Sequence, residues 1–257
     1  MRKIDNIEEL NKMLNTRFSR EYIRNSLKSI GTYEKNLDKI YIHEENEDLF
    51  IFNKRKDFYV MDAILKKSCP HSLSIDEDIV VEYVYRRDIS DFHDIIRGLD
   101  FKELIRRSSM TIRNFKADEE LLVLDDSYSD FLLKEIEDNF DHYYGCIPSR
   151  SDLSSKIKKN EFLGLMEDEN LVGFIEISKS GKKLIIDHIL ILDSYRAKGY
   201  SKRMINGLFS YGNREDFTSI ELFVNDDNKA AIRMYESMGF ERANIGSIIY
   251  RRKKNEG

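Results

Sequence analysis

The stretch IIDHILILDSYRAKGYSKRMINGLF, residues 185–209, contains a strand-like run, a turn and a helix-like run in direct succession. The apolar run ends at Leu192, and one glycine, Gly199, lies in the turn. Four cations surround this glycine: Arg196, Lys198, Lys202 and Arg203. Apolar residues then recur at helical spacing. The stretch therefore predicts a strand that leads into an amphipathic helix through a basic loop.

Such a loop has the properties of an anion site. A helix start exposes unpaired backbone N–H groups and the positive end of the helix dipole, and a glycine lets a ligand approach the backbone closely. Successive loop N–H groups can form an anion nest suited to a pyrophosphate. The spacing matches neither a Walker loop nor G-x-G-x-x-G. From the loop alone, a solvated basic helix start is the stronger interpretation.

The composition indicates a folded protein of about two domains. The chain has 257 residues, of which 41% are hydrophobic and 35% charged, with a net charge of −5. Neither half has the basic excess of a nucleic-acid binder, so we expect no nucleic-acid partner. Cys69 and Cys146 form no metal-ligand motif, and we expect no metal. No signal peptide or membrane-spanning run is visible, which predicts a cytoplasmic protein without a membrane partner.

The two halves contain similar segments. LFIFNKRKDFYVMDAIL, residues 49–65, aligns without gaps to FIEISKSGKKLIIDHIL, residues 174–190, and pairs Asp62 with Asp187. VEYVYRRDISDFHDIIRGLDF, residues 81–101, aligns likewise to IELFVNDDNKAAIRMYESMGF, residues 220–240. The extra residues of the second copy fall in the glycine loop. The pattern favours two related domains, although chance similarity remains the alternative.

The periodicity predicts an α/β fold in which each domain is a mixed, mostly antiparallel sheet flanked by helices. For the second half we expect the order β-α-α-β-β-β-α-β-α-β-β, the last two strands being 240–244 and 247–252. In the first half, helices are expected over 7–14 and 21–30. The domains are predicted to span residues 1–115 and 116–257.

Two motifs of the second half resemble the GNAT superfamily of N-acetyltransferases. RAKGYS, residues 196–201, resembles the acyl-CoA loop R/Q-x-x-G-x-G/A, with Ser201 where the family prefers glycine or alanine. NKAAIRMYESMGF, residues 228–240, resembles the second signature, N-x-x-A-x-x-x-Y-x-x-x-G-F. The resemblance covers about residues 117–252. The chain thus resembles two tandem GNAT-like domains, the N-terminal one degenerate.

The resemblance implies acetyl-CoA as the acyl-donor substrate. The pantetheine arm would pair like an extra strand beside Ile189, Leu190 and Ile191. The pyrophosphate would lie on the glycine loop, formed by Arg196, Ala197, Lys198, Gly199, Tyr200, Ser201 and Lys202. Asn228 would either touch the cofactor arm or cap its own helix.

The same resemblance implies catalytic roles. Tyr235 would protonate the departing thiolate, although packing in the core is the alternative. The positions where many family members carry a glutamate hold Phe223 and Ile185. We therefore rank Asp187 first and Glu221 second as the general base, with a water chain as a further alternative. Asp187 alternates with Ile189 and is expected to face the cleft. His188 is expected to point to the opposite face and to be structural.

The implied function is an acyl-CoA-dependent N-acyltransferase that transfers acetyl to a primary amine of a small molecule or peptide by direct attack. The alternatives are a non-catalytic acyl-CoA-binding sensor or interaction protein on the same fold, and a transferase that uses a different donor. In the first half, Ile96, Ile89 and Asp100 stand at the positions of Tyr235, Asn228 and Gly239. That half is therefore expected to be structural or to shape the acceptor site, and the chain to bind one CoA.

Overall fold

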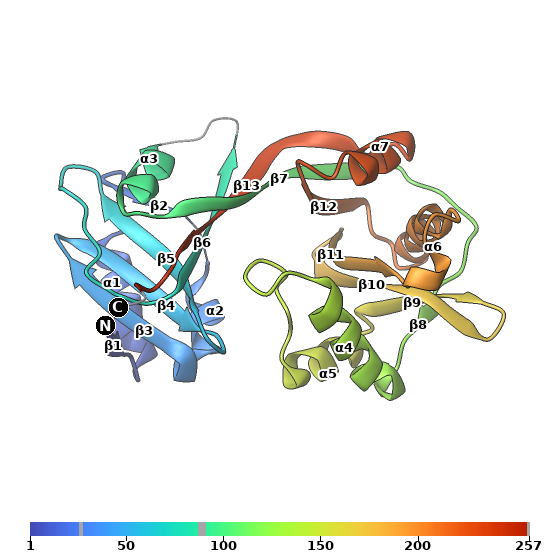
Figure 1. Cartoon of the computed structure of the whole chain (residues 1–257), viewed down its shortest axis with the longest axis horizontal. Helices are drawn as coiled ribbons and strands as arrows, with labels where there is room; N and C mark the ends of the chain where they lie inside the picture. Colours follow the sequence, from blue (N-terminus) through green and yellow to red (C-terminus); the bar gives the residue numbers. More distant parts are fainter. Residues whose placement is uncertain (26–27, 87–90, 256–257) are drawn as a thin grey trace. The chain divides into compact units, whose positions relative to one another are not determined.

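The computed structural model describes residues 1–25, 28–86 and 91–255, and the chain forms two compact units (Figure 1). The first unit comprises Met1–Arg107 together with Asn244–Gly257, and the second comprises Ser108–Ala243. These units differ from the predicted ranges 1–115 and 116–257. The difference arises because the last strand of the chain pairs within the first unit, at residues Ile245–Arg252.

The elements of the first half are short strands and helices. They are β1 (Arg2–Lys3), α1 (Ile7–Thr16), β2 (Tyr22–Arg24), α2 (Ile30–Glu34), β3 (Ile40–Glu45), β4 (Asp48–Lys54), β5 (Tyr59–Lys66), β6 (Ile79–Arg86), α3 (Asp91–Gly98) and β7 (Lys102–Arg113). The predicted helix over 7–14 is confirmed as α1. The prediction of a helix over 21–30 is wrong, since β2 forms at Tyr22 and α2 begins only at Ile30.

The second half follows the predicted order up to its end. Its elements are β8 (Leu122–Val123), α4 (Ser129–Asn139), α5 (Arg150–Ile157), β9 (Phe162–Glu167), β10 (Asn170–Ser180), β11 (Lys183–Ile191), α6 (Tyr200–Arg214), β12 (Ser219–Asn225), α7 (Lys229–Ser237) and β13 (Glu241–Arg252). The two predicted final strands are instead the single strand β13. Gly246 does not break it, and a Cβ atom there would meet Tyr85 at 2.4 Å. The Tyr85 side chain of β6 thus occupies the space where a side chain at position 246 would begin.

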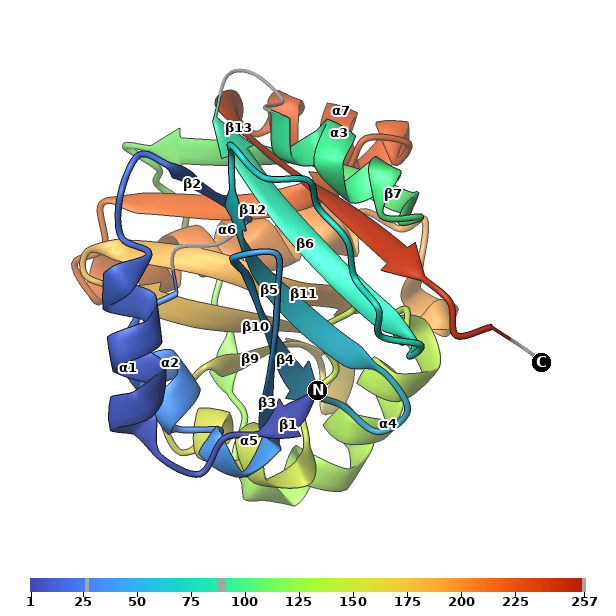
Figure 2. The same ribbon diagram turned by 90° about the vertical axis from the view of Figure 1, so that its left-hand side faces the viewer.

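Each unit has a mixed, mostly antiparallel sheet, as predicted. In the first unit the strand order is β1-β3-β4-β5-β6-β13, and β5 and β6 are parallel. Figure 2 shows β5, β6 and β13 beside one another. In the second unit the order is β7-β12-β11-β10-β9-β8, and β11 and β12 are parallel. The strands β7 and β13 continue through both units, so each sheet is completed by a strand from a distant part of the chain.

Helices cover both faces of the second sheet (Figure 1). One face packs against α6 and α7 through a core that includes Ile175, Leu184, Met204, Leu208 and Tyr235. The other face packs against α4 and α5 through Leu132, Ile136, Leu153, Phe174 and Leu190. Successive strand residues point to opposite faces, which explains how Leu190 and Ile191 join different cores.

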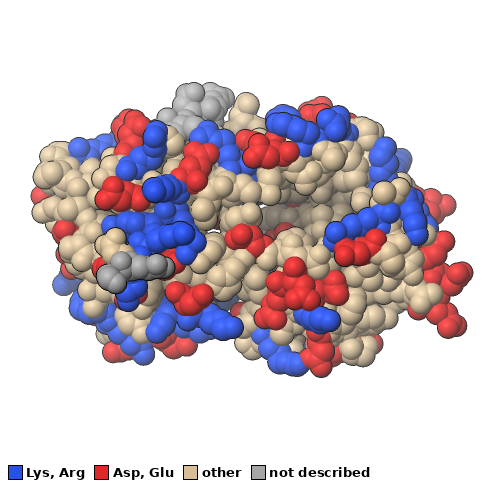
Figure 3. Space-filling model, in the orientation of Figure 1, with Lys and Arg blue, Asp and Glu red and all other residues tan. Residues whose placement is uncertain are grey.

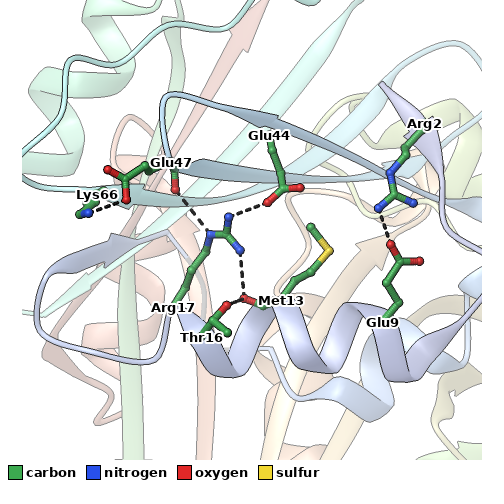
Figure 4. Close-up of polar contacts among 8 residues, drawn as sticks. All are labelled: Arg2, Glu9, Met13, Thr16, Arg17, Glu44, Glu47 and Lys66. Atoms are coloured by element: carbon green, nitrogen blue, oxygen red, sulfur yellow. Dashed lines mark hydrogen bonds and ion pairs between the residues drawn. The ribbon is translucent and has the colours of Figure 1, made fainter.

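Charged contacts hold α1 to the strands of the first unit (Figure 4). Arg17 follows the last turn of α1, and its guanidinium donates to the Met13 carbonyl at 3.2 Å and to Glu44 Oε1 at 2.6 Å. Glu44 lies on β3, so one side chain links the end of the helix to the sheet. Arg2 and Glu9 form a second ion pair near the helix start.

The repeat is visible in the way the helices α3 and α7 end. Gly239, with φ +92°, follows α7, and Phe240 N–H donates to the Tyr235 carbonyl at 3.1 Å. At the equivalent place, Asp100 has φ +64° and Phe101 N–H donates to the Ile96 carbonyl at 3.3 Å. Both turns therefore have the same left-handed backbone conformation, although only one has glycine.

The shared turn conformation predicts how substitutions at Gly239 and Asp100 change stability, and the two positions can be compared with each other. Gly239→Ala should lower the thermal unfolding midpoint, because a Cβ atom at this φ costs about 1 kcal/mol. Asp100→Gly relieves the same strain and should leave the midpoint unchanged or raise it. Scanning calorimetry of the two variants measures both effects. A lower midpoint for Asp100→Gly together with an unchanged one for Gly239→Ala would contradict the interpretation.

Candidate functional site

The loop between β11 and α6 has an unusual backbone. A turn of 3₁₀ helix covers Asp193–Tyr195, and Ala197 and Gly199 then both adopt positive φ, +60° and +86°. Gly199 is the N-cap of α6. A Cβ atom built on Gly199 would have no other part of the described chain within 4 Å, its own helix and chain neighbours aside. A glycine is therefore favoured here by the positive φ, and the space beside it is open.

The loop presents a run of free backbone donors. Within the part of the chain that the structure describes, the N–H groups of Ala197, Lys198, Gly199, Tyr200 and Ser201 have no hydrogen-bond acceptor. The next N–H, that of Lys202, donates to the Gly199 carbonyl at 3.1 Å. Five consecutive free donors at a helix start have the arrangement that an anion nest needs.

The four cations of the loop are not equally available to an anion. Arg196 donates through Nε to the Ile191 carbonyl at 3.0 Å, and Lys198 Nζ donates to the Ser194 carbonyl at 2.8 Å. Arg203 pairs with Glu119 at 3.1 Å and with Glu167 at 2.5 Å. Lys202 alone among them has no partner among the described residues. The backbone N–H groups, with Lys202 nearby, thus supply most of the positive potential.

The strands β11 and β12 separate beside this loop. Their parallel ladder joins Lys183–Ile186 to Ser219–Leu222 and continues no further in the described chain. Leu192 N–H donates to the Val172 carbonyl of β10 at 3.0 Å, and the alternation of an antiparallel ladder then directs Leu190 to β10 as well. The backbone groups of Ile189 and Ile191 consequently point into the gap beside β12.

This geometry refines the predicted strand contacts. Ile189 offers both its N–H and its carbonyl to the gap, whereas the Ile191 carbonyl already accepts the hydrogen bond from Arg196. The backbone of Leu190 is committed to β10, opposite Phe174. An extended ligand in the gap would thus pair with Ile189 and with the N–H of Ile191.

Two residues of the second motif lie on α7. Asn228 is the N-cap, and its Oδ1 accepts the Ala231 N–H at 3.0 Å. The capping interpretation is therefore correct for the oxygen. The side-chain Nδ2 donates no hydrogen bond to the described residues, so it is free for a ligand.

Tyr235 lies in the core but keeps a free hydroxyl. The residue is 5% exposed, and its ring packs edge-on against Phe240. The hydroxyl donates no hydrogen bond to another residue of the described chain. Burial raises the pKa of Tyr235 to about 12, so the phenol is protonated at neutral pH.

A β-bulge changes the placement of Asp187. The pairing of β10 with β11 shifts between Glu176 and Ile177, and Asp187 is the extra residue. The Asp187 carboxylate therefore contacts Lys156 of α5 at 3.0 Å, on the face opposite to that of Ile189. The expectation that Asp187 and Ile189 share a face is wrong, because strict alternation fails at a bulge.

Sequence reasoning missed a buried charged cluster beside Asp187. Glu176 is 1% exposed, pairs with Lys156, and binds His188 Nδ1 at 2.6 Å. His188 Nε2 lies 2.5 Å from the Gly145 carbonyl, in the loop between α4 and α5. Burial alone would raise the pKa of Glu176, but the His188 hydrogen bond and the Lys156 charge outweigh it and keep that pKa low. His188 is structural, as predicted.

Glu221, the second candidate base, lies on β12 opposite Ile185, within the paired part of the ladder. Its carboxylate binds Lys183 Nζ at 2.5 Å and accepts a hydrogen bond from Ser109 at 3.4 Å. Asp187 is instead the first residue beyond the ladder. Of the two carboxylates, Asp187 is thus nearer along the chain to the open part of the gap.

The described residues contain no group of three His, Cys, Asp or Glu side chains that could hold a metal ion. None of their helices combines the length and apolar character needed to span a bilayer. Acidic and basic side chains are interspersed on the face shown in Figure 3.

Comparison with known families identifies the second half. Residues 124–240 match the model of the Acetyltransferase (GNAT) family, so this part of the chain is a GNAT domain. N-alpha-acetyltransferase RimI of Mycobacterium tuberculosis is 29% identical over 96 residues, which are 36% of this chain and 59% of that protein. An uncharacterized protein of Mycobacterium leprae is 30% identical over 95 residues, 35% of this chain and 26% of that protein. The chain thus spans less than two thirds of either relative.

Solved structures support the fold of the whole chain. A GCN5-related N-acetyltransferase from Sphaerobacter thermophilus has a TM-score of 0.63 at 10% identity, with 93% of this chain and 98% of that chain covered. A GNAT-family acetyltransferase from Colwellia psychrerythraea gives 0.58 at 11% identity, with 98% of each chain covered. A tandem GNAT protein from the clavulanic acid biosynthesis pathway gives 0.54 at 10% identity, with 82% of this chain and 80% of that chain covered. Both halves therefore have GNAT-like architecture.

The loop geometry predicts the effect of a substitution at Gly199. Gly199→Val should weaken CoA binding at least about tenfold, because valine avoids positive φ and would turn the free N–H groups away. Gly181→Val is a matched control, since Gly181 also has positive φ, +57°, and open space, but lies in the turn between β10 and β11. Calorimetric titration with CoA measures the affinity. Unchanged affinity in a folded Gly199→Val protein would contradict the assignment of the nest.

Proposed function

We propose that the chain is an acyl-CoA-dependent N-acyltransferase, with acetyl-CoA as donor and a primary amine of a small molecule or peptide as acceptor. The observation that carries the proposal is the run of five free N–H groups at the start of α6, adjoining a gap between β11 and β12. The nest suits a pyrophosphate and the gap suits an extended pantetheine arm. The match of residues 124–240 to the GNAT family supports the same donor.

The arm would add as a strand beside β11. Its amide groups would pair with Ile189 and with the N–H of Ile191, which are the backbone groups that β12 leaves unpaired. This pairing would place the thioester where β11 and β12 separate. The Asn228 Nδ2 would be a further donor to the arm, while its Oδ1 keeps α7 capped.

The reaction needs three proton or charge events. The acceptor ammonium must lose a proton, the thioester oxygen must be stabilised as the amine attacks, and the CoA thiolate must be protonated as it leaves. A backbone N–H near Ile191 would stabilise the thioester oxygen. The Tyr235 phenol, which is protonated and has a free hydroxyl, would supply the last proton.

We assign the general base to Asp187 first and to Glu221 second. Two features of Asp187 support this order. It is the first residue beyond the paired part of β11 and β12, and its side chain is 26% exposed. Glu221 is held more firmly, between Lys183 and Ser109. A water between Asp187 and the amine would allow proton transfer without breaking the pair with Lys156.

One observation favours the alternative of a non-catalytic acyl-CoA-binding protein. Both candidate bases are engaged in ion pairs, Asp187 with Lys156 and Glu221 with Lys183. A sensor would keep the nest and the gap and would need neither a base nor the Tyr235 proton. Release of CoA thiol from acetyl-CoA, measured across a panel of amines and peptides, separates the two functions. An enzyme releases thiol only with an acceptor, whereas a sensor binds CoA and releases none.

The role of Tyr235 predicts a separation of turnover from binding. Tyr235→Phe should lower kcat by about ten- to a thousandfold and leave acetyl-CoA affinity nearly intact, because only the proton donor is lost. Tyr211→Phe is a matched control, since Tyr211 is similarly buried but lies on α6 with its hydroxyl near the Asn160 carbonyl. Steady-state kinetics and calorimetry give both quantities. Full turnover by Tyr235→Phe would assign the residue to packing.

The assignment of the base predicts a difference between two carboxylates. Asp187→Asn should lower kcat/KM about tenfold or more and flatten the acidic limb of the pH–rate profile, whereas Glu221→Gln should have a smaller effect. Both substitutions also remove one partner of an ion pair, so unfolding midpoints of each variant serve as the control. A normal pH–rate profile in both variants would leave a water chain as the base.

A further inference from the structure

The first unit contains the same kind of strand gap as the second. The parallel ladder of β5 and β6 joins only Tyr59–Ile79 and Val60–Val80 in the described chain. Beyond that point the gap is not empty, because β2 pairs with β5. Ile23 lies opposite Leu65, and Arg24 lies opposite Ile64. The chain thus supplies a short strand of its own beside β5, where β6 has left it.

Asn25 follows β2 and joins the two sides of the gap. It is 3% exposed, and its Nδ2 donates to the Met61 carbonyl at 3.2 Å and to the Glu82 carbonyl at 2.8 Å. Its Oδ1 accepts the Ala63 N–H at 2.7 Å. Met61 and Ala63 belong to β5 and Glu82 belongs to β6. One buried amide therefore satisfies three backbone groups that the separation of the strands leaves open.

The strand registers show which backbone groups of β11 correspond to the backbone groups of β5 that face the gap. Phe50 pairs with Ala63 in the first hairpin, and its repeat partner Ile175 pairs with Ile189 in the second. Equivalent residues of the two units differ by 125 in number on β4 and β10, but by 126 on β5 and β11 after the bulge, because Asp187 is an extra residue there. By the same count, Leu65 corresponds to Ile191. Two of the positions that Asn25 and β2 satisfy, the N–H of Ala63 and the backbone of Leu65, are thus the equivalents of Ile189 and Ile191.

We propose that the segment 22–25 is an internal occupant of a cofactor cleft in the first unit. It takes the strand position beside β5 that a pantetheine arm would take beside β11, which is the part of the inference that rests on the proposed function. Ile23 pairs where the arm would pair with Ile191, and the Asn25 amide replaces a ligand amide at the equivalent of Ile189. The first unit consequently binds no CoA, and the chain has a single cofactor site.

The connection after β5 supports this assignment independently. The second unit needs the loop of residues 192–199 and the start of α6 to hold a pyrophosphate. In the first unit, residues 67–78 join β5 to β6 without a helix, and none of them has positive φ. No nest of free N–H groups at a helix start is thus formed there. A CoA molecule would have to displace a tethered strand without gaining the anion contacts that hold it elsewhere.

Tethering makes the occupant hard to displace. The segment 22–25 connects directly to α1 through residues 17–21, so its binding to the gap is intramolecular and carries a high effective concentration. The Glu21 carbonyl accepts the Lys67 N–H at 2.9 Å, which extends the pairing by one further bond. Displacement would also leave the buried groups of Met61, Ala63 and Glu82 without partners.

Hydrogen exchange of the unmodified protein tests the proposal directly. Amides of residues 61–66 should exchange slowly without any ligand and should not change when CoA is added. Amides of residues 187–203 should slow at least about tenfold with CoA. Titration calorimetry should give one CoA per chain. A stoichiometry of two, or slowing at residues 61–66 on addition of CoA, would overturn the internal occupant.

Two substitutions at Asn25 test the segment by itself. Asn25→Ala removes all three side-chain hydrogen bonds, and Asn25→Asp, which keeps the shape, places a carboxylate against two carbonyl oxygens. Each should speed exchange at residues 61–66 at least about tenfold. Asn11→Ala, at an exposed position on α1, is the control and should change nothing. Exchange in both Asn25 variants equal to that of the control would contradict the role of Asn25.

The two experiments fail in distinguishable ways. If CoA protects neither segment, the proposed donor is wrong, while the Asn25 variants still report whether the segment seals the gap. If CoA protects residues 187–203 and the Asn25 variants behave like the control, the proposed function stands and the internal occupant does not. Should an Asn25 variant fail to fold, the exchange and stoichiometry of the unmodified protein decide the matter.

Discussion

A pair of parallel strands that separate leaves backbone donors and acceptors without partners, and this constraint explains most of what the two units do. Buried N–H and carbonyl groups that lose a hydrogen bond cost about 1–3 kcal/mol each. The first unit satisfies them internally with β2 and Asn25. The second unit leaves Ile189 and the Ile191 N–H open, and it adds a run of free N–H groups at the start of α6. These open groups are the ones with which the proposed pantetheine arm would pair.

In each unit, the segment between the first two helices contacts an equivalent strand, β5 in the first unit and β11 in the second. In the first unit this segment enters the gap as β2. In the second it is the loop of residues 140–149, and its contacts with β11 include that of the Gly145 carbonyl with His188 Nε2 and that of the Phe140 ring with the His188 ring. Both ring nitrogens of His188 lie within hydrogen-bond distance of acceptors, the Glu176 carboxylate and that carbonyl. Lys156 pairs with both Glu176 and Asp187, so the carboxylates of the cluster have a cationic partner.

Much of the fold could be predicted from the sequence because its cues are local. Helical spacing located α6 and α7, and the two GNAT motifs located the nest and Tyr235. The bulge at Asp187 could not be predicted from the sequence. The two segments have equal length and align without a gap, so the alignment shows no sign of an extra residue. In the strand, however, one extra residue moves every later side chain to the other face. For the same reason the alignment paired Asp62 with Asp187, although the strand register makes Asp62 the equivalent of His188. The position of Ile89 lies outside the described residues.

The basic loop shows a second limit of local reasoning. The sequence places four cations around Gly199, yet Arg196, Lys198 and Arg203 bind carbonyl or carboxylate oxygens of the protein. These pairings are long-range or depend on the turn geometry, so no spacing rule reveals them. Their effect is to shape the loop: Arg196 ties it to the end of β11, and Arg203 fixes the first turn of α6 to Glu119 and Glu167. The proposed anion site would thus be built from backbone dipoles that cations hold in place, and its affinity would depend on the conformation of Ala197 and Gly199 more than on net charge.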